Sequence, residues 1–169
     1  MEFQLRPWTQ NDLPSLVKHA NNIKIAKMLT NQFPLPYTED SGKAFIKHAT
    51  EHTPLRILAI DVEGEAVGAI GLHPQADIQC KNAEMGYWLS ESYWGRGIMS
   101  KAIPKMVDYG FQNLSIERIF ARPFGHNLGS QKALEKAGFR FEAKFEKTLF
   151  KYDEYVDELY YAVRKEDWK

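Results

Sequence analysis

The fold of this chain is decided largely by the stretch Glu91-Ser92-Tyr93-Trp94-Gly95-Arg96-Gly97. It lies between a strand-like segment, residues 83–89, and an amphipathic segment that begins near residue 98. Two glycines one residue apart allow backbone angles that other residues avoid and let the chain pass close to a ligand. The first turn of the following helix offers free N–H groups and the positive end of its dipole, which together hold phosphate well. The sequence therefore predicts that a phosphorylated cofactor binds at this turn.

The composition is that of an ordinary soluble domain: 169 residues, 44% hydrophobic and 26% charged. Twenty-two basic residues balance 22 acidic ones, which argues against a broad nucleic-acid-binding surface. No apolar run approaches the ~20 residues of a membrane helix, and the single cysteine, Cys80, cannot form an internal disulfide. We expect one domain over residues 1–169, soluble and cytoplasmic, which binds neither nucleic acid nor membrane and is a monomer or homodimer.

Apolar periodicity and turn residues predict a mixed order of helices and strands. Thr9 and Asp12 resemble a capping box for a first helix that ends near residue 20. Further helices are expected over residues 23–29, 39–52 and 98–114, and between the cap Asn127 and the terminator Gly138. Strands are expected over residues 3–8, 55–62, 66–72, 83–89, 118–124, 139–146 and 155–163, with residues 147–154 as the last connection. This order indicates an α+β fold with a mixed central sheet flanked by helices.

Gly95 and Gly97 alone leave the ligand open. A dinucleotide site requires a third Gly or Ala where Ser100 stands, and a P-loop requires Gly-Lys-Ser/Thr, which is missing. A glycine turn required only by packing is an equally good interpretation of these two residues.

A second segment, residues 127–139, supplies the missing evidence. It reads Asn127-Leu128-Gly129-Ser130-Gln131-Lys132-Ala133-Leu134-Glu135-Lys136-Ala137-Gly138-Phe139. With the strand Glu84-Met85-Gly86-Tyr87-Trp88-Leu89 and the glycine turn, it resembles the GNAT N-acetyltransferase superfamily. The ribosomal-protein-alanine N-acetyltransferase branch is the most similar, and Leu5-Arg6-Pro7 and Phe33-Pro34-Leu35-Pro36-Tyr37 also fit that branch.

The resemblance implies that acetyl-coenzyme A is the cosubstrate, bound where two central parallel strands splay apart. Backbone groups of Tyr87, Trp88 and Leu89 would hold the pantetheine arm, and Asn127 would contact the cofactor. The pyrophosphate would lie on the turn formed by Ser92, Tyr93, Trp94, Gly95, Arg96, Gly97 and Ile98. One residue departs from the family pattern, because Ser92 stands where a Gln or Arg is frequent.

The implied reaction is direct transfer of acetyl from the thioester to a primary amine. Only a neutral amine attacks, and a protein N-terminus with a pKa near 8 needs about 1.4 kcal/mol of help at pH 7, against ~4–5 kcal/mol for a lysine. By resemblance, Glu84 would be the general base and Ser130 would protonate the leaving thiolate. An ion pair for Glu84, and helix capping for Ser130 and Asn127, are the structural alternatives.

The acceptor is expected to contact Phe33, Tyr37, Trp88 and Tyr152, although a core role for Trp88 is the simpler interpretation. The acidic residues Asp153, Glu154, Asp157 and Glu158 could attract a cationic amine or simply face solvent. Two other functions stay open: a small-amine or antibiotic acetyltransferase, and a regulatory module that binds coenzyme A without turnover.

One metal-like pattern occurs at residues 48–52, His48-Ala49-Thr50-Glu51-His52, which matches the inverted zinc-protease motif His-x-x-Glu-His. The helix ends at once at Thr53-Pro54, and no convincing further ligand follows. We therefore expect no metal and interpret the pattern as a polar helix end.

Overall fold

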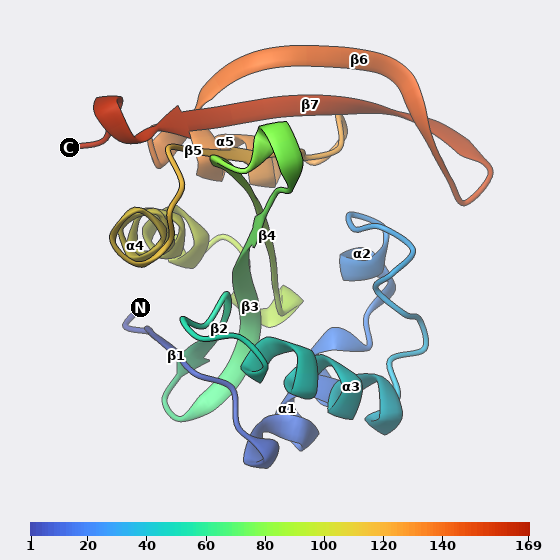
Figure 1. Ribbon diagram of the computed structural model, residues 1–169. Helices are drawn as coiled ribbons and strands as arrows, with labels where there is room; N and C mark the ends of the chain where they lie inside the picture. The colour runs from blue at the N-terminus through green and yellow to red at the C-terminus, as the bar shows by residue number, and fades with distance from the viewer. The chain divides into compact units, whose positions relative to one another are not determined.

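The computed structural model describes residues 1–169 (Figure 1). Its contacts divide the chain into two compact units. The first comprises Met1–Gly71 and Tyr87–Ala102, and the second comprises Leu72–Gly86 and Ile103–Lys169. The expectation of one domain over residues 1–169 stays a prediction.

Hydrogen bonds order seven strands as β1-β2-β3-β4-β5-β7-β6. The β1–β2, β2–β3, β5–β7 and β6–β7 pairs are antiparallel, whereas β4 and β5 are parallel. The predicted α+β fold with a mixed sheet is thus confirmed. The strands are β1 (Gln4–Arg6), β2 (Ile57–Val62), β3 (Glu65–Pro74), β4 (Asn82–Leu89), β5 (Arg118–Ala121), β6 (Arg140–Lys151) and β7 (Glu154–Arg164).

The parallel ladder between β4 and β5 is short. It runs from the pair Asn82–Arg118 to the pair Glu84–Phe120, and β4 then continues to Leu89 without a partner on β5. The splay between these two strands, which the family resemblance implies, stays a prediction.

The first unit contains three helices, α1 (Leu13–Ala20), α2 (Ile23–Ala26) and α3 (Glu39–Thr50). The chain enters α1 through the predicted capping box, where the Thr9 backbone N–H donates to Asp12 Oδ2 at 2.8 Å. Helices α1 and α3 lie side by side (Figure 1). Between them and the sheet lies a core that includes Trp8, Leu16, Ile46 and Trp88.

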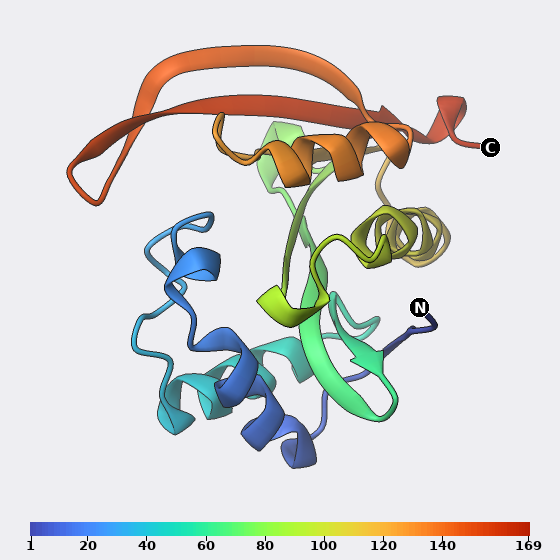
Figure 2. The ribbon, with the colours of Figure 1, turned by 180° about the vertical axis from the view of Figure 1, so that it is seen from behind.

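The second unit is built on the long β6–β7 hairpin, along which α5 (Leu128–Lys136) lies (Figure 2). Helix α4 (Ile98–Asn113) supplies its residues from Ile103 onward to this unit. Gly110 of α4 packs closely here, because a Cβ at that position would lie 2.3 Å from Leu72 Cδ1 on β3. No helix combines the length and the apolar character that a bilayer-spanning segment requires.

The predicted connection at residues 147–154 is wrong, because β6 and β7 extend to a two-residue turn. Tyr152 and Asp153 form that turn with φ values of 51° and 60°, which suit the right-handed twist of a hairpin. The register shifts between Phe145 and Leu149, and Lys147 absorbs the irregularity with φ 53°. Its backbone N–H donates to Asp157 Oδ1 at 2.8 Å, which keeps the ladder intact beyond the bulge.

Among the predicted boundaries that move, three have a clear local cause. Helix α2 ends at Ala26, not residue 29, because the Met28 N–H donates to the Ile25 carbonyl in a tighter i to i−3 turn. Helix α3 ends at Thr50 for the same reason, since the Glu51 N–H donates to His48. Strand β5 ends at Ala121, two residues before Pro123, which lacks an N–H for the ladder.

Candidate functional site

The glycine turn has the backbone geometry that the sequence predicts. Gly95 and Gly97 have φ values of 73° and 74°, in the region that side chains disfavour. No heavy atom lies within 4 Å of a Cβ added at Gly95, and the nearest to one at Gly97 is Ser100 Oγ at 3.8 Å. Backbone conformation, and not a lack of space, therefore requires glycine at both positions. The residues from Trp94 to Gly97 are exposed and lead directly into the N-terminus of α4.

Side chains around the turn fix its two ends. The Trp94 indole Nε1–H donates to the Leu89 carbonyl at 2.8 Å, which ties the turn to the end of β4. The Arg96 guanidinium lies 5.5 Å from the centre of the Tyr93 ring, and Ile98 is buried at the start of α4. An exposed backbone between two anchored ends, next to a cationic side chain, is an arrangement that can bind an anion.

Three of the four predicted acceptor residues come together in the first unit. The Phe33 ring lies 5.2 Å from the Tyr37 ring and 5.9 Å from the Trp88 ring, centre to centre. Tyr37 and Trp88 are 5% and 8% exposed, so the core interpretation of Trp88 is confirmed. Burial raises the pKa of Tyr37 to about 12. Phe33 is the more accessible of the three rings.

Glu84 forms a bidentate ion pair. Arg122 Nε and Nη2 each donate to one of its carboxylate oxygens at 2.9 Å, and Arg122 Nη1 also donates to Glu158 at 3.2 Å. The hydrogen bond with Glu84, more than any other contact, raises the pKa of Arg122 above its ordinary value. Glu84 can therefore take a proton only on lone pairs that face away from the guanidinium, or after the pair opens.

The same ion pair lines a concave pocket of about 370 Å³ in the second unit. Phe120 and Tyr160 stack beside it with ring centres 6.0 Å apart and planes within 7°. Arg118 lies over the Phe120 ring and pairs with Glu142. The predicted base is thus in a polar hollow, and the charges around it are largely balanced by internal partners.

Asn127 caps α5 as the structural alternative predicts. Its Oδ1 accepts a hydrogen bond from the Ser130 backbone N–H at 3.1 Å. That bond uses the backbone of Ser130 and leaves the role of its hydroxyl a prediction. Gly138 ends the helix region with φ 92°, as expected.

The structure places the predicted cofactor residues from Tyr87 to Ile98 in the first unit, with the aromatic acceptor residues. Glu84, Asn127, Ser130 and Tyr152 belong to the second unit. Tyr152 stands in the β6–β7 turn, half exposed, with the Lys151 ammonium 5.1 Å from its ring centre. The convergence of all these residues on one site stays a prediction.

Sequence reasoning missed a set of polar residues that hold the start of the glycine turn. His19 contacts Ser90, and Asn22 contacts Glu91. The partners in each pair are about 70 residues apart in the sequence, so no local spacing pattern shows that they are in contact. Only a sheet topology that brings α1 beside the end of β4 could have revealed them.

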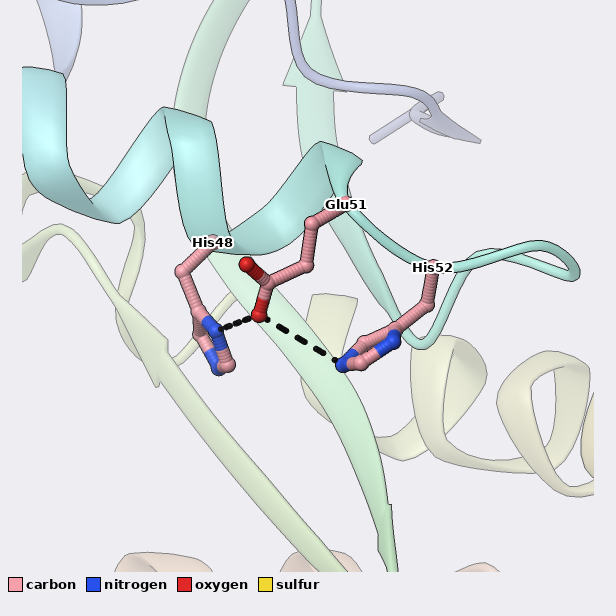
Figure 3. A group of neighbouring side chains, drawn as sticks. All are labelled: His48, Glu51 and His52. Atoms are coloured by element: carbon pink, nitrogen blue, oxygen red, sulfur yellow. Dashed lines mark hydrogen bonds and ion pairs between the residues drawn. The ribbon is translucent and has the colours of Figure 1, made fainter.

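The pattern at residues 48–52 forms a small cluster at the end of α3 (Figure 3). His48 Nδ1 and His52 Nε2 lie 2.5 Å and 3.5 Å from the same Glu51 oxygen. The three atoms that could act as metal ligands, one from each residue, lie within 4.8 Å of one another. The histidine side chains are 53% and 35% exposed. A carboxylate shared by an exposed and a partly buried histidine is a common surface arrangement at a helix end, and the expectation of no metal stays a prediction.

The sequence pattern of the Acetyltransferase (GNAT) domain matches residues 2–140 of the chain. The chain belongs to the GNAT acetyltransferase family. This acetyltransferase is similar to the uncharacterized N-acetyltransferase YnaD of Bacillus subtilis strain 168, with 25% identity over 168 residues, 99% of the chain and 93% of YnaD. The ribosomal-protein-serine acetyltransferase of Escherichia coli K12 is 30% identical over 107 residues, 63% of the chain and 59% of that protein. The spermidine N(1)-acetyltransferase of the same organism is 24% identical over 149 residues, 87% and 77% respectively.

Solved structures show the same fold. A GNAT-family acetyltransferase of Bacillus anthracis matches with a TM-score of 0.83 at 23% identity, covering 98% of the chain and 96% of that structure. The self-immunity acetyltransferase MccE, in complex with acetyl-CoA and AMP, matches with a TM-score of 0.82 at 21% identity, covering 96% and 92%. A Vibrio cholerae spermidine N-acetyltransferase, in complex with CoA and spermine, matches with a TM-score of 0.82 at 20% identity, covering 98% and 97%. The GNAT acetyltransferase fold is therefore shown.

Proposed function

We propose that this GNAT acetyltransferase transfers acetyl from acetyl-coenzyme A to the α-amine of a protein N-terminus. The observation that carries the proposal is the exposed turn with left-handed Gly95 and Gly97 at the start of α4. Its backbone N–H groups and the helix dipole suit the pyrophosphate of the cofactor. The complex of the structurally similar MccE with acetyl-CoA supports the choice of cofactor.

In this proposal the pantetheine arm pairs with backbone groups of β4 beyond its last partner on β5. Residues Tyr87, Trp88 and Leu89 follow Glu84, the last residue of β4 that pairs with β5. The backbone N–H of Tyr87 or Trp88 would stabilise the oxyanion that forms on the thioester carbonyl. Main-chain groups would thus hold both the arm and the transition state, which makes this part of the site tolerant of side-chain variation such as Ser92.

The transfer is direct. The amine nitrogen forms a bond to the thioester carbonyl carbon, the carbon–sulfur bond breaks, and the thiolate leaves. Glu84 would receive the proton that the amine loses, through a water molecule on a carboxylate lone pair that Arg122 does not engage. The Ser130 hydroxyl would give its proton to the thiolate and regain one from solvent, to which Glu84 releases the proton that it took from the amine. Cys80 is exposed and outside this scheme, so a Cys80→Ser variant serves as a control for an acyl-enzyme route.

The acceptor assignment rests on amine chemistry and on the aromatic cluster. An N-terminal amine is more often neutral at pH 7 than a lysine or polyamine amine. Phe33 offers an accessible apolar surface next to buried Tyr37 and Trp88, which suits the side chain of a first residue. Two of the acidic residues expected to attract a cation are engaged internally, Asp157 by Lys144 and Glu158 by Arg122. This weakens the case for a polyamine.

The deciding experiment is an acceptor screen in which release of free coenzyme A thiol is measured. Peptides with a free N-terminal alanine or serine, the same peptides blocked at the N-terminus, spermidine and an aminoglycoside would be compared. Turnover only with the free peptides supports the proposal. Turnover only with spermidine or the aminoglycoside would assign a small-amine acceptor instead. Binding of acetyl-coenzyme A without turnover of any acceptor would favour a regulatory module.

A further inference from the structure

The first residue before the glycine turn, Ser90, is held by a buried histidine. His19 Nδ1 lies 2.9 Å from Ser90 Oγ, and His19 Nε2 lies 2.9 Å from Glu65 Oε1. Ser90 and His19 are 4% and 9% exposed. Because a carboxylate only accepts, Nε2 carries a hydrogen, and in the neutral ring Nδ1 accepts from the Ser90 hydroxyl. The C-terminal turn of α1 is therefore attached to the start of the cofactor turn.

The next residue, Glu91, is held by the start of α2. Asn22 Nδ2 donates to Glu91 Oε2 at 2.9 Å, and Lys24 Nζ donates to Oε1 at 2.5 Å. Lys24, and after it Asn22, lower the pKa of Glu91, which keeps this carboxylate ionised. Asn22 also caps α2, since its Oδ1 accepts from the Lys24 N–H at 2.8 Å. A displacement of Glu91 would thus act directly on the first turn of α2.

The residue beside Asn22 holds a different loop. Asn21 Oδ1 accepts a hydrogen bond from the Tyr37 backbone N–H at 3.0 Å. The Tyr37 ring packs on Phe33, which packs on Trp88. Two consecutive side chains in a short connection between helices therefore engage two loops, Asn22 the cofactor turn and Asn21 the aromatic acceptor loop.

We propose that residues 19–24 couple the two halves of the reaction site, with His19, Asn21 and Asn22 as positioning residues. Binding of the cofactor at residues 92–98 would fix Glu91, and through Asn22 and Asn21 it would fix the backbone at Tyr37. The ordering of the acceptor loop is then completed when the cofactor binds, so acceptor affinity rises. By linkage, the acceptor must raise cofactor affinity by the same factor. The inference rests on the proposed function, because it takes residues 92–98 and residues 33–37 as the cofactor and acceptor sides.

The Tyr37 amide is the direct reporter, because its hydrogen is the one donated to Asn21. Amide hydrogen exchange would be measured with and without saturating coenzyme A. In the unaltered protein we expect slower exchange both at residues 92–98 and at Tyr37, by about fivefold or more at Tyr37, a factor at the low end of typical couplings. Asn22→Ser retains a good N-cap for α2 but is too short to reach Glu91, so protection at Tyr37 should be lost while that at residues 92–98 persists.

Glu91→Ala tests the same link from the other side and leaves Asn22, with its cap on α2, in place. Lys27→Ala is the matched control, because Lys27 is exposed at the end of α2. The proposal is overturned if coenzyme A protects residues 92–98 but not Tyr37 in the unaltered protein. It is also overturned if Asn22→Ser and Glu91→Ala both keep the protection at Tyr37. If coenzyme A protects neither region, the proposed cofactor site itself fails, and the coupling fails with it.

Discussion

Glu84 and Arg122 form a bidentate ion pair, in which Arg122 Nε and Nη2 donate to the two Glu84 carboxylate oxygens at 2.9 Å each. Glu84 is the last residue of β4 that pairs with β5, so its side chain stands where the two parallel strands part. The Glu84 carboxylate could act as a structural ion-pair partner of Arg122 or as the general base for acetyl transfer. These two roles predict different responses to substitution.

If Glu84 is the general base, Glu84→Gln lowers kcat about 100-fold or more, because positioned bases contribute about 10²–10⁴. The affinity for acetyl-coenzyme A should change little, since the amide has the same shape. Glu158→Gln is the matched control, because it removes the other carboxylate from Arg122 and should leave kcat within a few-fold. Steady-state kinetics check both variants. Equal losses of kcat in Glu84→Gln and Arg122→Gln would instead show that the Glu84 carboxylate is a structural ion-pair partner and not the base.

Phe33→Ala should raise the acceptor KM about tenfold, equivalent to about 1.4 kcal/mol, and leave the KM for acetyl-coenzyme A unchanged. The reason is that Phe33 is the accessible member of the aromatic cluster with Tyr37 and Trp88. Leu35→Ala, in the same loop and 41% exposed, is the control for a general loosening of the loop. Parallel changes in both KM values for Phe33→Ala would argue that this ring supports the fold and not the acceptor.

The Asp12 carboxylate of the capping box should make the stability of the fold depend on pH in the acid range. Burial would raise its pKa, but hydrogen bonds from Arg6 and Thr9 prevail and hold the pKa below its ordinary value. A depressed carboxylate pKa stabilises the fold above the unfolded value, near 3.9, and this contribution disappears as pH falls through the folded-state pKa.

Asp12→Asn should therefore lower the melting temperature by roughly 3–12 °C at pH 7, from hydrogen bonds to charged groups worth about 1.5–3 kcal/mol. Thermal denaturation from pH 7 to pH 2 checks this. The difference between the two proteins should shrink below about pH 4. A difference that stays constant with pH would show that packing, and not the charge, is what Asp12 contributes.

Acetyl transfer should be independent of metal. Glu51, at the end of α3, contacts both His48 and His52, and none of the three side chains is buried (Figure 3). Dialysis against EDTA should leave kcat and the melting temperature unchanged, and so should addition of zinc. A zinc-dependent rise in melting temperature that His48→Ala with His52→Ala abolishes would contradict this expectation and establish a metal site.

The fold could be predicted from the sequence wherever the signal is local. Glycines with positive φ, the Thr9–Asp12 capping box and the Asn127 cap each mark, to within a few residues, where a helix or turn begins or ends. The two strands β6 and β7 could be predicted, but their extension to a two-residue turn could not, because that turn is Tyr152-Asp153 and lacks the glycine that usually marks such a turn.

The candidate site shows the same limit. The glycine turn could be predicted from its own residues, and the other site residues were assigned by the family resemblance, but the partners of their side chains could not be predicted. Arg122 engages Glu84 from 38 residues away, and His19 engages Ser90 from 71 residues away. Such pairings depend on how the strands are ordered in the sheet, which hydrophobic periodicity does not encode.

The central claim is that main-chain N–H groups at the start of α4 hold the pyrophosphate of coenzyme A. Titration of the isotopically labelled protein with coenzyme A, followed by amide NMR, tests it most directly, with dephospho-coenzyme A and pantetheine as companions. We predict saturable shifts in the amides of residues 92–98 with both nucleotide-bearing ligands and much weaker ones with pantetheine, which lacks the diphosphate. Gly97→Ala, which strains a backbone with φ 74°, should reduce the affinity. Saturating coenzyme A that leaves the amides of residues 92–98 unshifted would contradict the account.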